Sequence, residues 1–173
     1  MRLFYALWPD DAVRERLAAL QAHVRGKPTR YDNLHITLAF LGEQSEDLLP
    51  ELRTLLELLP RDPVDLVLDR MGYFPRNRIA WAGMHDLPLP LRDLHGALTG
   101  LLERHDIAFD RGARFRPHVT LARDADPPPD IDFEPIPWAA RRIVLVQSSM
   151  QGDGVRYRVL AEQAPRVHDP YGN

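Results

Sequence analysis

Hydrophobic and polar positions along the chain follow two different spacings, and these predict a mixture of strands and helices. Segments that alternate apolar and polar residues and are rich in β-branched and aromatic side chains predict strands. The predicted strands are residues 2–7, 34–41, 64–71, 78–84, 116–122, 142–148 and 155–162. Apolar residues three or four positions apart predict helices at about residues 10–25 and 91–105, and Ser45, followed by Glu46 and Asp47, is expected to cap another helix that ends near Leu59. The chain is therefore expected to be α+β, with strand pairs and helices recurring about once in each half.

Prolines and glycines mark the expected connections between these elements. Gly42 is expected to close the strand 34–41, and residues 74–77 (F-P-R-N) are expected to form a turn. The Pro-rich stretch 124–137 is predicted to be an irregular surface connection, and residues 165–173 a frayed tail.

Length and composition are those of one globular domain, so residues 1–173 are expected to form a single domain. No segment approaches the roughly 20 apolar residues that cross a bilayer, and the opening MRLFYALWPD lacks the long apolar region of a signal peptide. The chain has no cysteine, which leaves no disulfide framework, thiolate nucleophile or Cys-based metal site. These features fit a cytoplasmic protein without a membrane partner.

Charge limits the partners further. The formal net charge of −3 argues against a protein that coats nucleic acid through bulk electrostatics. Of the 22 basic residues, only Lys27 is not arginine. A GC-rich genome is the simplest explanation, yet arginine also suits two-point contacts with phosphate, so clusters near a site still carry information.

One short motif occurs twice. Residues 35–39 read H-I-T-L-A and residues 118–122 read H-V-T-L-A, 83 positions apart. On a strand, His35 and Thr37 point to the same face about 6.5–7 Å apart, and His118 and Thr120 repeat the arrangement. If the halves pack about a two-fold axis, these four side chains converge on one cleft.

The four side chains suit the cleavage of a cyclic phosphodiester. Such a reaction requires one group to activate water and another to protonate the leaving ribose oxygen, and histidine can do either near neutral pH. Threonine hydroxyls can donate hydrogen bonds to the non-bridging oxygens. No metal is required. A single H-x-T is common in sheets, but its recurrence with both faces preserved favours function.

The sequence resembles the 2H phosphoesterases, particularly the RNA 2′,3′-cyclic phosphodiesterases, also called 2′-5′ RNA ligases. The likeness lies in the opening RLFYAL, in NLHITLAFLG at 33–42 and in RPHVTLAR at 116–123. It implies a bilobal α+β fold, with two antiparallel sheets related by a pseudo-two-fold axis, helices outside and the active site in the groove between lobes. The implied reaction opens a terminal 2′,3′-cyclic phosphate on RNA to a 2′-phosphate, without metal or nucleotide cofactor. We expect a monomer.

The resemblance also implies roles for individual residues. His35 would be the general acid and His118 the general base, although the two motifs themselves do not distinguish these roles. Five positions after each histidine stand Phe40, expected to stack the terminal base, and Arg123, expected to contact phosphate. Strict alternation places both on the face opposite the histidines, so each strand must end, twist or bulge there. Otherwise Phe40 is a core residue and Arg123 a surface charge.

Other polar residues have weaker signals. Arg116 shares the face of His118 by alternation and is a candidate contact for the RNA backbone. Tyr157 is expected to pack in its sheet rather than to stack on a nucleotide. Individually, several arginines are expected to be surface charges, although they could line the groove: Arg30, Arg76, Arg78, Arg111 and Arg114. The remaining histidines are also expected at the surface: His23, His85, His95, His105 and His168.

Three alternatives to hydrolysis of RNA ends remain open. Ligation would use the same site with a 5′-hydroxyl in place of water. A small nucleotide, such as a cyclic ADP-ribose phosphate, could replace RNA as substrate. A non-catalytic RNA-end-binding protein of the same fold is the alternative from another class, and it is disfavoured because both histidines and both threonines are present.

Overall fold

A computed structural model describes residues 1–112 and 114–164. The strands are β1 (Arg2–Leu7), β2 (Lys27–Pro28), β3 (Ile36–Glu43), β4 (Val64–Leu68), β5 (Arg70–Phe74), β6 (Ile79–Gly83), β7 (His118–Arg123), β8 (Ile136–Ala140), β9 (Ile143–Gln151) and β10 (Gly154–Glu162). The helices are α1 (Asp11–Gln21), α2 (Leu49–Leu58) and α3 (Leu89–Arg104), with 3₁₀ turns at Tyr31–Asn33 and Glu46–Leu48. The expected tail at 165–173 and His168 lie outside the described residues.

The strands form two lobes that meet at the two histidine motifs. One lobe has the order β10-β9-β1-β3, and the other contains β7, β6 and β5, with β2 also paired to β7. A single antiparallel pair, Ile36 with Val119, joins β3 to β7, so the two lobes form one continuous sheet. The α+β bilobal architecture is confirmed, but the expected separate sheets are joined at this point.

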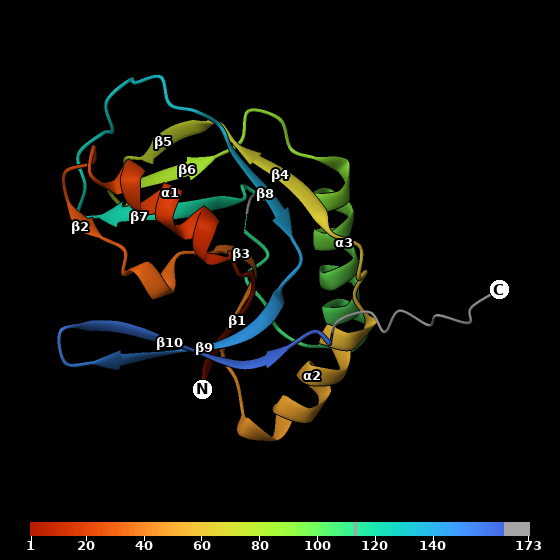
Figure 1. The fold of residues 1–173 in the computed structure, drawn as a ribbon. Helices are drawn as coiled ribbons and strands as arrows, with labels where there is room; N and C mark the ends of the chain where they lie inside the picture. The colour runs from red at the N-terminus through yellow and green to blue at the C-terminus, as the bar shows by residue number, and fades with distance from the viewer. Residues whose placement is uncertain (113, 165–173) are drawn as a thin grey trace.

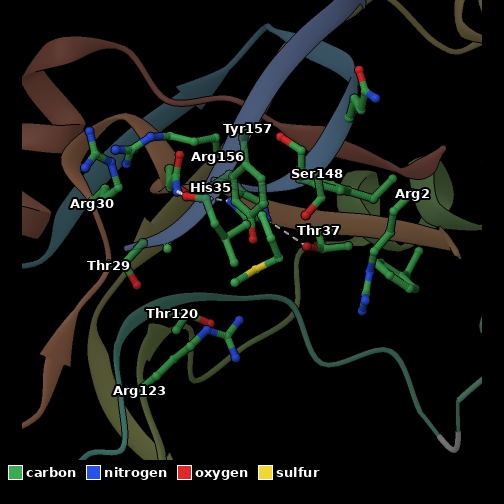
Figure 2. Close-up of a pocket in the computed structure, with 18 of the residues that line it drawn as sticks. Arg2, Thr29, Arg30, His35, Thr37, Thr120, Arg123, Ser148, Arg156 and Tyr157 are labelled. Atoms are coloured by element: carbon green, nitrogen blue, oxygen red, sulfur yellow. Dashed lines mark hydrogen bonds between the residues drawn. The ribbon is translucent and has the colours of Figure 1, made fainter. Parts of the chain in front are cut away.

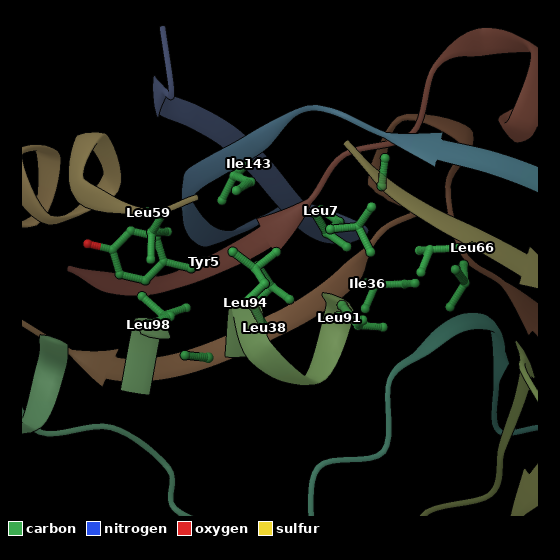
Figure 3. Close-up of a cluster of buried hydrophobic side chains, with 14 of the residues drawn as sticks. Tyr5, Leu7, Ile36, Leu38, Leu59, Leu66, Leu91, Leu94, Leu98 and Ile143 are labelled. Atoms are coloured by element: carbon green, nitrogen blue, oxygen red, sulfur yellow. The ribbon is translucent and has the colours of Figure 1, made fainter. Parts of the chain in front are cut away.

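The core lies on the sheet face opposite the histidines. Ile36 and Leu38 point into it, together with Tyr5 and Leu7 of β1, and α3 covers them with leucines (Figure 3). Helices α2 and α3 lie on one side of the molecule, whereas α1 crosses β7 of the other lobe (Figure 1). The apolar stripes predicted for the first and third helices are largely buried, as Val13, Leu17 and Leu20 show in α1.

Helix boundaries follow local capping. Asp10 caps α1, and its carboxylate accepts a hydrogen bond from the backbone N–H of Val13 at 2.9 Å. Ser45 was expected to cap the second helix, but it caps a 3₁₀ turn that leads into α2, where Pro50 lies in the first turn. The expected first helix also ends earlier than predicted, at Gln21.

One strand prediction was wrong, and one predicted connection was too long. The run 64–71 is not one strand, because Leu68 still pairs in β4 whereas Arg70 begins β5 in the other sheet. Alternation cannot reveal this change, since both segments are extended and only their partners differ. The stretch 124–137 is not wholly irregular, because Ile136 and Pro137 belong to β8, which pairs only with β4. Proline is tolerated there because β8 is an edge strand.

Candidate active site

The four motif side chains line one cavity of about 1050 Å³. Ile36 and Val119, both fully buried, form the antiparallel pair at the lobe junction, and their side chains lie on the core face. Extending this register by one residue on either side places His35 across from Thr120 and Thr37 across from His118. Figure 2 shows His35 and Thr37 on one side of the cavity and Thr120 on the other. The structure therefore brings the two motifs together across the lobe junction.

Both histidine rings are held by the same backbone contact. His35 lies one residue before β3, and its Nδ1 is 2.6 Å from the carbonyl oxygen of Asn33. His118 begins β7, and its Nδ1 is 2.6 Å from the carbonyl oxygen of Arg116. A carbonyl oxygen only accepts, so each Nδ1 carries the proton. Each Nε2 is left to accept or to pass on a proton, and that of His35 is 2.9 Å from the hydroxyl oxygen of Thr37.

Aromatic rings enclose His35. Trp8 stacks on it with ring centroids 5.7 Å apart, Phe4 lies at 5.0 Å, and Tyr157 approaches edge-on at 5.3 Å. The pKa of His35 is lowered to about 4, chiefly by burial and in smaller part by the neighbouring charges of His118 and Arg123, and the hydrogen bond to Asn33 opposes this shift. In the free protein at neutral pH, His35 is therefore uncharged.

His118 has a more open environment. Phe74 meets it edge-on at 5.0 Å and Trp81 lies at 6.3 Å. Burial again lowers its pKa, Arg123 adds to the effect, and the hydrogen bond to Arg116 opposes it. Both imidazoles thus favour the neutral state until an anion binds between them.

Matching β-bulges bring Phe40 and Arg123 into the cavity. Against β1, Thr37 pairs with Ala6 and Ala39 pairs with Tyr5, which leaves Leu38 as an extra residue. Against β6, Thr120 and Ala122 pair with consecutive residues, which leaves Leu121 as the extra residue. Each bulge shifts the alternation by one, so position +5 rejoins the histidine face, and both Phe40 and Arg123 line the cavity. A third irregularity at Leu41 carries β3 past Gly42, whose φ of +67° favours glycine.

The cavity carries an excess of positive charge. Its basic lining residues are Arg2, Lys27, Arg30, Arg123 and Arg156, and its acidic ones are Glu43, Asp124 and Asp153. Two of the carboxylates pair within the cavity, Asp124 with Lys27 at 2.9 Å and Asp153 with Arg156 at 3.4 Å. The remaining arginines suit an anionic substrate.

Arg116 does not line this cavity. Because β7 begins only at His118, the alternation assumed for Arg116 does not reach it, and its exposed side chain lines a second cavity instead. Of the weaker arginine candidates, Arg30 lines the main cavity and Arg114 the second one. Arg78 pairs with Asp126 and Arg111 with Glu103, whereas Arg76 is an exposed residue of the turn after β5.

Several contributors were missed or undervalued by the sequence interpretation. Phe4 and Trp8, which border His35, follow the alternation of RLFYALW. This alternation predicts that the two side chains share one face of the strand, but it does not predict that His35 lies next to them. Tyr157 does pack in its sheet, as expected, but it also contacts His35 and lines the cavity. His95 is not a plain surface residue, because it stacks on Phe115 at 3.8 Å. His23, His85 and His105 are exposed, as predicted.

Residues 1–112 and 114–164 contain no cluster of three or more His, Cys, Asp or Glu side chains arranged to hold a metal ion. None of their helices is long and apolar enough to cross a membrane.

Comparison with known proteins relates this chain to a protein family. Residues 9–150 match the sequence profile of the 2′-5′ RNA ligase superfamily. The RNA 2′,3′-cyclic phosphodiesterase of Escherichia coli is 34% identical over 94% of this chain and 96% of its own length. That of Thermus thermophilus is 33% identical over 92% and 88%. The crystal structure of E. coli LigT in its apo form superimposes with a TM-score of 0.81 at 31% identity, covering 95% of this chain and 96% of that one.

A bilobal α+β fold with two H-x-T motifs on one cavity defines a 2H phosphoesterase. Within that class, this chain belongs to the 2′-5′ RNA ligase superfamily.

Proposed function

We propose that this protein is an RNA 2′,3′-cyclic phosphodiesterase that opens a terminal cyclic phosphate to a 2′-phosphate. The observation that carries the proposal is the meeting of His35 and His118, each held through Nδ1, on one arginine-rich cavity. Relatives at 34% and 33% identity have this name, and the structure of E. coli LigT in complex with 3′-AMP superimposes with a TM-score of 0.79.

The proposed reaction is an in-line displacement at phosphorus. One histidine removes a proton from water as the water oxygen bonds to phosphorus. The other histidine donates a proton to O3′ as the P–O3′ bond breaks, which leaves the phosphate on O2′. Each positioned proton transfer is typically worth about 10²–10⁴ in rate. We assign His35 as the acid and His118 as the base.

The low pKa values of the two histidines suit the base, which must be neutral, and require the acid to gain its proton when the substrate binds. Both imidazoles are neutral before substrate arrives, because burial and Arg123 disfavour their charged forms. A bound phosphodiester anion favours protonation of the imidazole beside it, which supplies the acid. The hydroxyls of Thr37 and Thr120 and the guanidinium of Arg123 then stabilise the non-bridging oxygens. No metal has a part in this scheme.

The terminal base is assigned to Phe40. Its ring lines the cavity, and the guanidinium of Arg2 lies over it at 5.0 Å from the centroid. A nucleobase can stack on such a ring. Because every residue of the proposed set comes from one chain, we propose that the monomer is active, and size-exclusion chromatography of the active fraction tests this.

The test is incubation of EDTA-treated protein with an RNA oligonucleotide ending in a 2′,3′-cyclic phosphate. A terminal 2′-phosphate is the expected product, and a His118→Ala preparation is the control for contaminating nucleases. Tight binding without turnover would instead indicate a non-catalytic RNA-end-binding protein. A 3′-phosphate product would contradict the assigned leaving group.

A further inference from the structure

A second cavity of about 380 Å³ shares His118 with the main one. Its lining residues are Arg70, Phe74, Trp81, Met84, His85, Leu87, Arg114, Phe115, Arg116, Pro117 and His118. None of the roles proposed above uses it. Among the described residues, His118 is the one that lines both cavities, so the second cavity adjoins the proposed reaction site.

Trp81 forms a flat wall of this cavity because two glycines make room for its indole. Gly72 pairs with Trp81 across β5 and β6, and a Cβ on Gly72 would lie 2.1 Å from the indole Cζ2. A Cβ on Gly83 would lie 2.8 Å from Cζ3. The ring therefore lies across both glycines, close to the sheet. An aromatic side chain lying on a sheet is a recurrent platform for nucleobases.

The other rings extend this platform. Phe74 lies 5.4 Å from Trp81, and Phe115 lines the same cavity. The guanidinium of Arg70, an exposed residue of β5, lies over the indole at 5.2 Å from its centroid. Because this side chain is long and exposed, it can move aside and cover an incoming base from above. The cavity thus offers stacking surfaces on more than one side.

The charge of the lining residues indicates which kind of ligand fits the second cavity. Arg70, Arg114 and Arg116 line the cavity, and no Asp or Glu is among its described lining residues. Arginine binds phosphate through two parallel hydrogen bonds, and aromatic rings next to such cations are typical of single-stranded nucleic acid sites. A nucleotide, with a planar base and an anionic phosphate, matches both features.

We propose that the second cavity is a nucleotide subsite that holds the penultimate nucleotide of the RNA substrate. This rests on the proposed function. The terminal nucleotide occupies the main cavity with its cyclic phosphate between the histidines, and the chain continues past His118. The base of the preceding nucleotide stacks on Trp81, and the phosphodiester that joins the two nucleotides contacts Arg114 and Arg116. The protein therefore selects RNA ends over mononucleotides.

The test compares KM for cytidine 2′,3′-cyclic phosphate with KM for a dinucleotide that ends in the same group. In the wild type, the dinucleotide is expected to have a KM at least about fivefold lower, since stacking of one base is worth this much or more. Trp81→Leu and the double variant Arg114→Gln/Arg116→Gln should each lower the ratio of the two KM values severalfold, because each removes one of the two contacts. Trp81→Phe keeps a stacking face and should preserve most of the ratio.

Arg53→Gln, at an exposed position on α2, is the matched control and should change neither KM. An unchanged ratio in the Trp81→Leu and arginine variants would overturn the proposal, as would a wild type that does not distinguish the two substrates. A loss confined to joining with a separate 5′-hydroxyl strand would also overturn it and assign the cavity to that strand. Failure of the proposed function would look different, because neither substrate would then be hydrolysed.

Discussion

The two H-x-T motifs have nearly the same sequence and the same local geometry, yet their surroundings differ. Both histidines bond through Nδ1 to the carbonyl oxygen two residues earlier, and both strands bulge at the leucine after the threonine. His35 is enclosed by Phe4, Trp8 and Tyr157. His118 instead lies on the boundary between two cavities.

The difference shows what a repeated motif can and cannot specify. The motif fixes ring orientation and tautomer, because these depend on local backbone geometry. The pKa depends on what packs around the ring, and burial lowers it to about 4 at His35. Two copies of one motif can therefore perform unequal tasks, as an acid and base pair requires.

The largest expected effect comes from removing either imidazole. His35→Ala and His118→Ala should each lower kcat by at least about 10²-fold, because each removes one positioned proton transfer. Steady-state hydrolysis of an RNA cyclic phosphate measures this, with thermal unfolding as the control for folding. Near-normal turnover by either variant would contradict the two-histidine mechanism.

A substrate with an activated leaving group sharpens this comparison. A 3′-deoxynucleoside 2′-(4-nitrophenyl) phosphodiester keeps its phosphate on O2′, and its leaving group, 4-nitrophenolate, does not need protonation, so it should restore much of the activity of the variant that lacks the acid. We expect that variant to be His35→Ala. Rescue of His118→Ala alone would reverse the assignment of acid and base.

The two motif threonines should contribute unequally to kcat. The hydroxyl oxygen of Thr37 lies 2.9 Å from Nε2 of His35, whereas that of Thr120 has no hydrogen-bond partner within the described residues. Thr120→Val should therefore lower kcat by about 10²-fold, as loss of a donor to the transition state does, and Thr37→Val by less. The serine variants retain a hydroxyl and serve as controls. Equal losses at both positions would show that the difference in the free protein has no effect on catalysis.

Arg123 should influence the pH dependence of catalysis through both histidines. Its positive charge lowers the pKa of His35 and of His118, so Arg123→Gln should raise both and move the whole pH profile of kcat/KM to higher pH. The lost phosphate contact should also raise KM about tenfold. Arg123→Lys keeps the charge and should keep the wild-type pH optimum. A profile that does not move in Arg123→Gln would refute this electrostatic role.

Phe40, at the equivalent position of the first motif, should have the smallest effect. Phe40→Leu should raise KM roughly fivefold, because a stacking surface is lost while the catalytic groups remain. Ribose 2,3-cyclic phosphate, which has no base, is the matched substrate and should show no change. A similar increase in KM for both substrates would identify Phe40 as a packing residue.

Most elements could be predicted from local patterns. The amphipathic stripes of α1 and α3 and the strand periods of β1, β9 and β10 depend on residues close in sequence. The change of sheet between Leu68 and Arg70 could not be predicted, since pairing partners leave no trace in the period. Strand β8 was missed because it contains Pro137, and proline in a sequence argues against a strand. Proline disfavours only a central strand, however, and β8 is an edge strand.

The sequence alone determined the proposed catalytic set. His35, Thr37, His118 and Thr120 are identified by a repeat, and a repeat needs no coordinates to be found. Only the tertiary structure decided that Phe40 and Arg123 face the cavity, because β-bulges at Leu38 and Leu121 arise from pairing with neighbouring strands. It also decided that Arg116 lies in the second cavity and that His35 is the more enclosed histidine. Burial and pairing are properties of residues far apart in sequence, and a local pattern does not contain them.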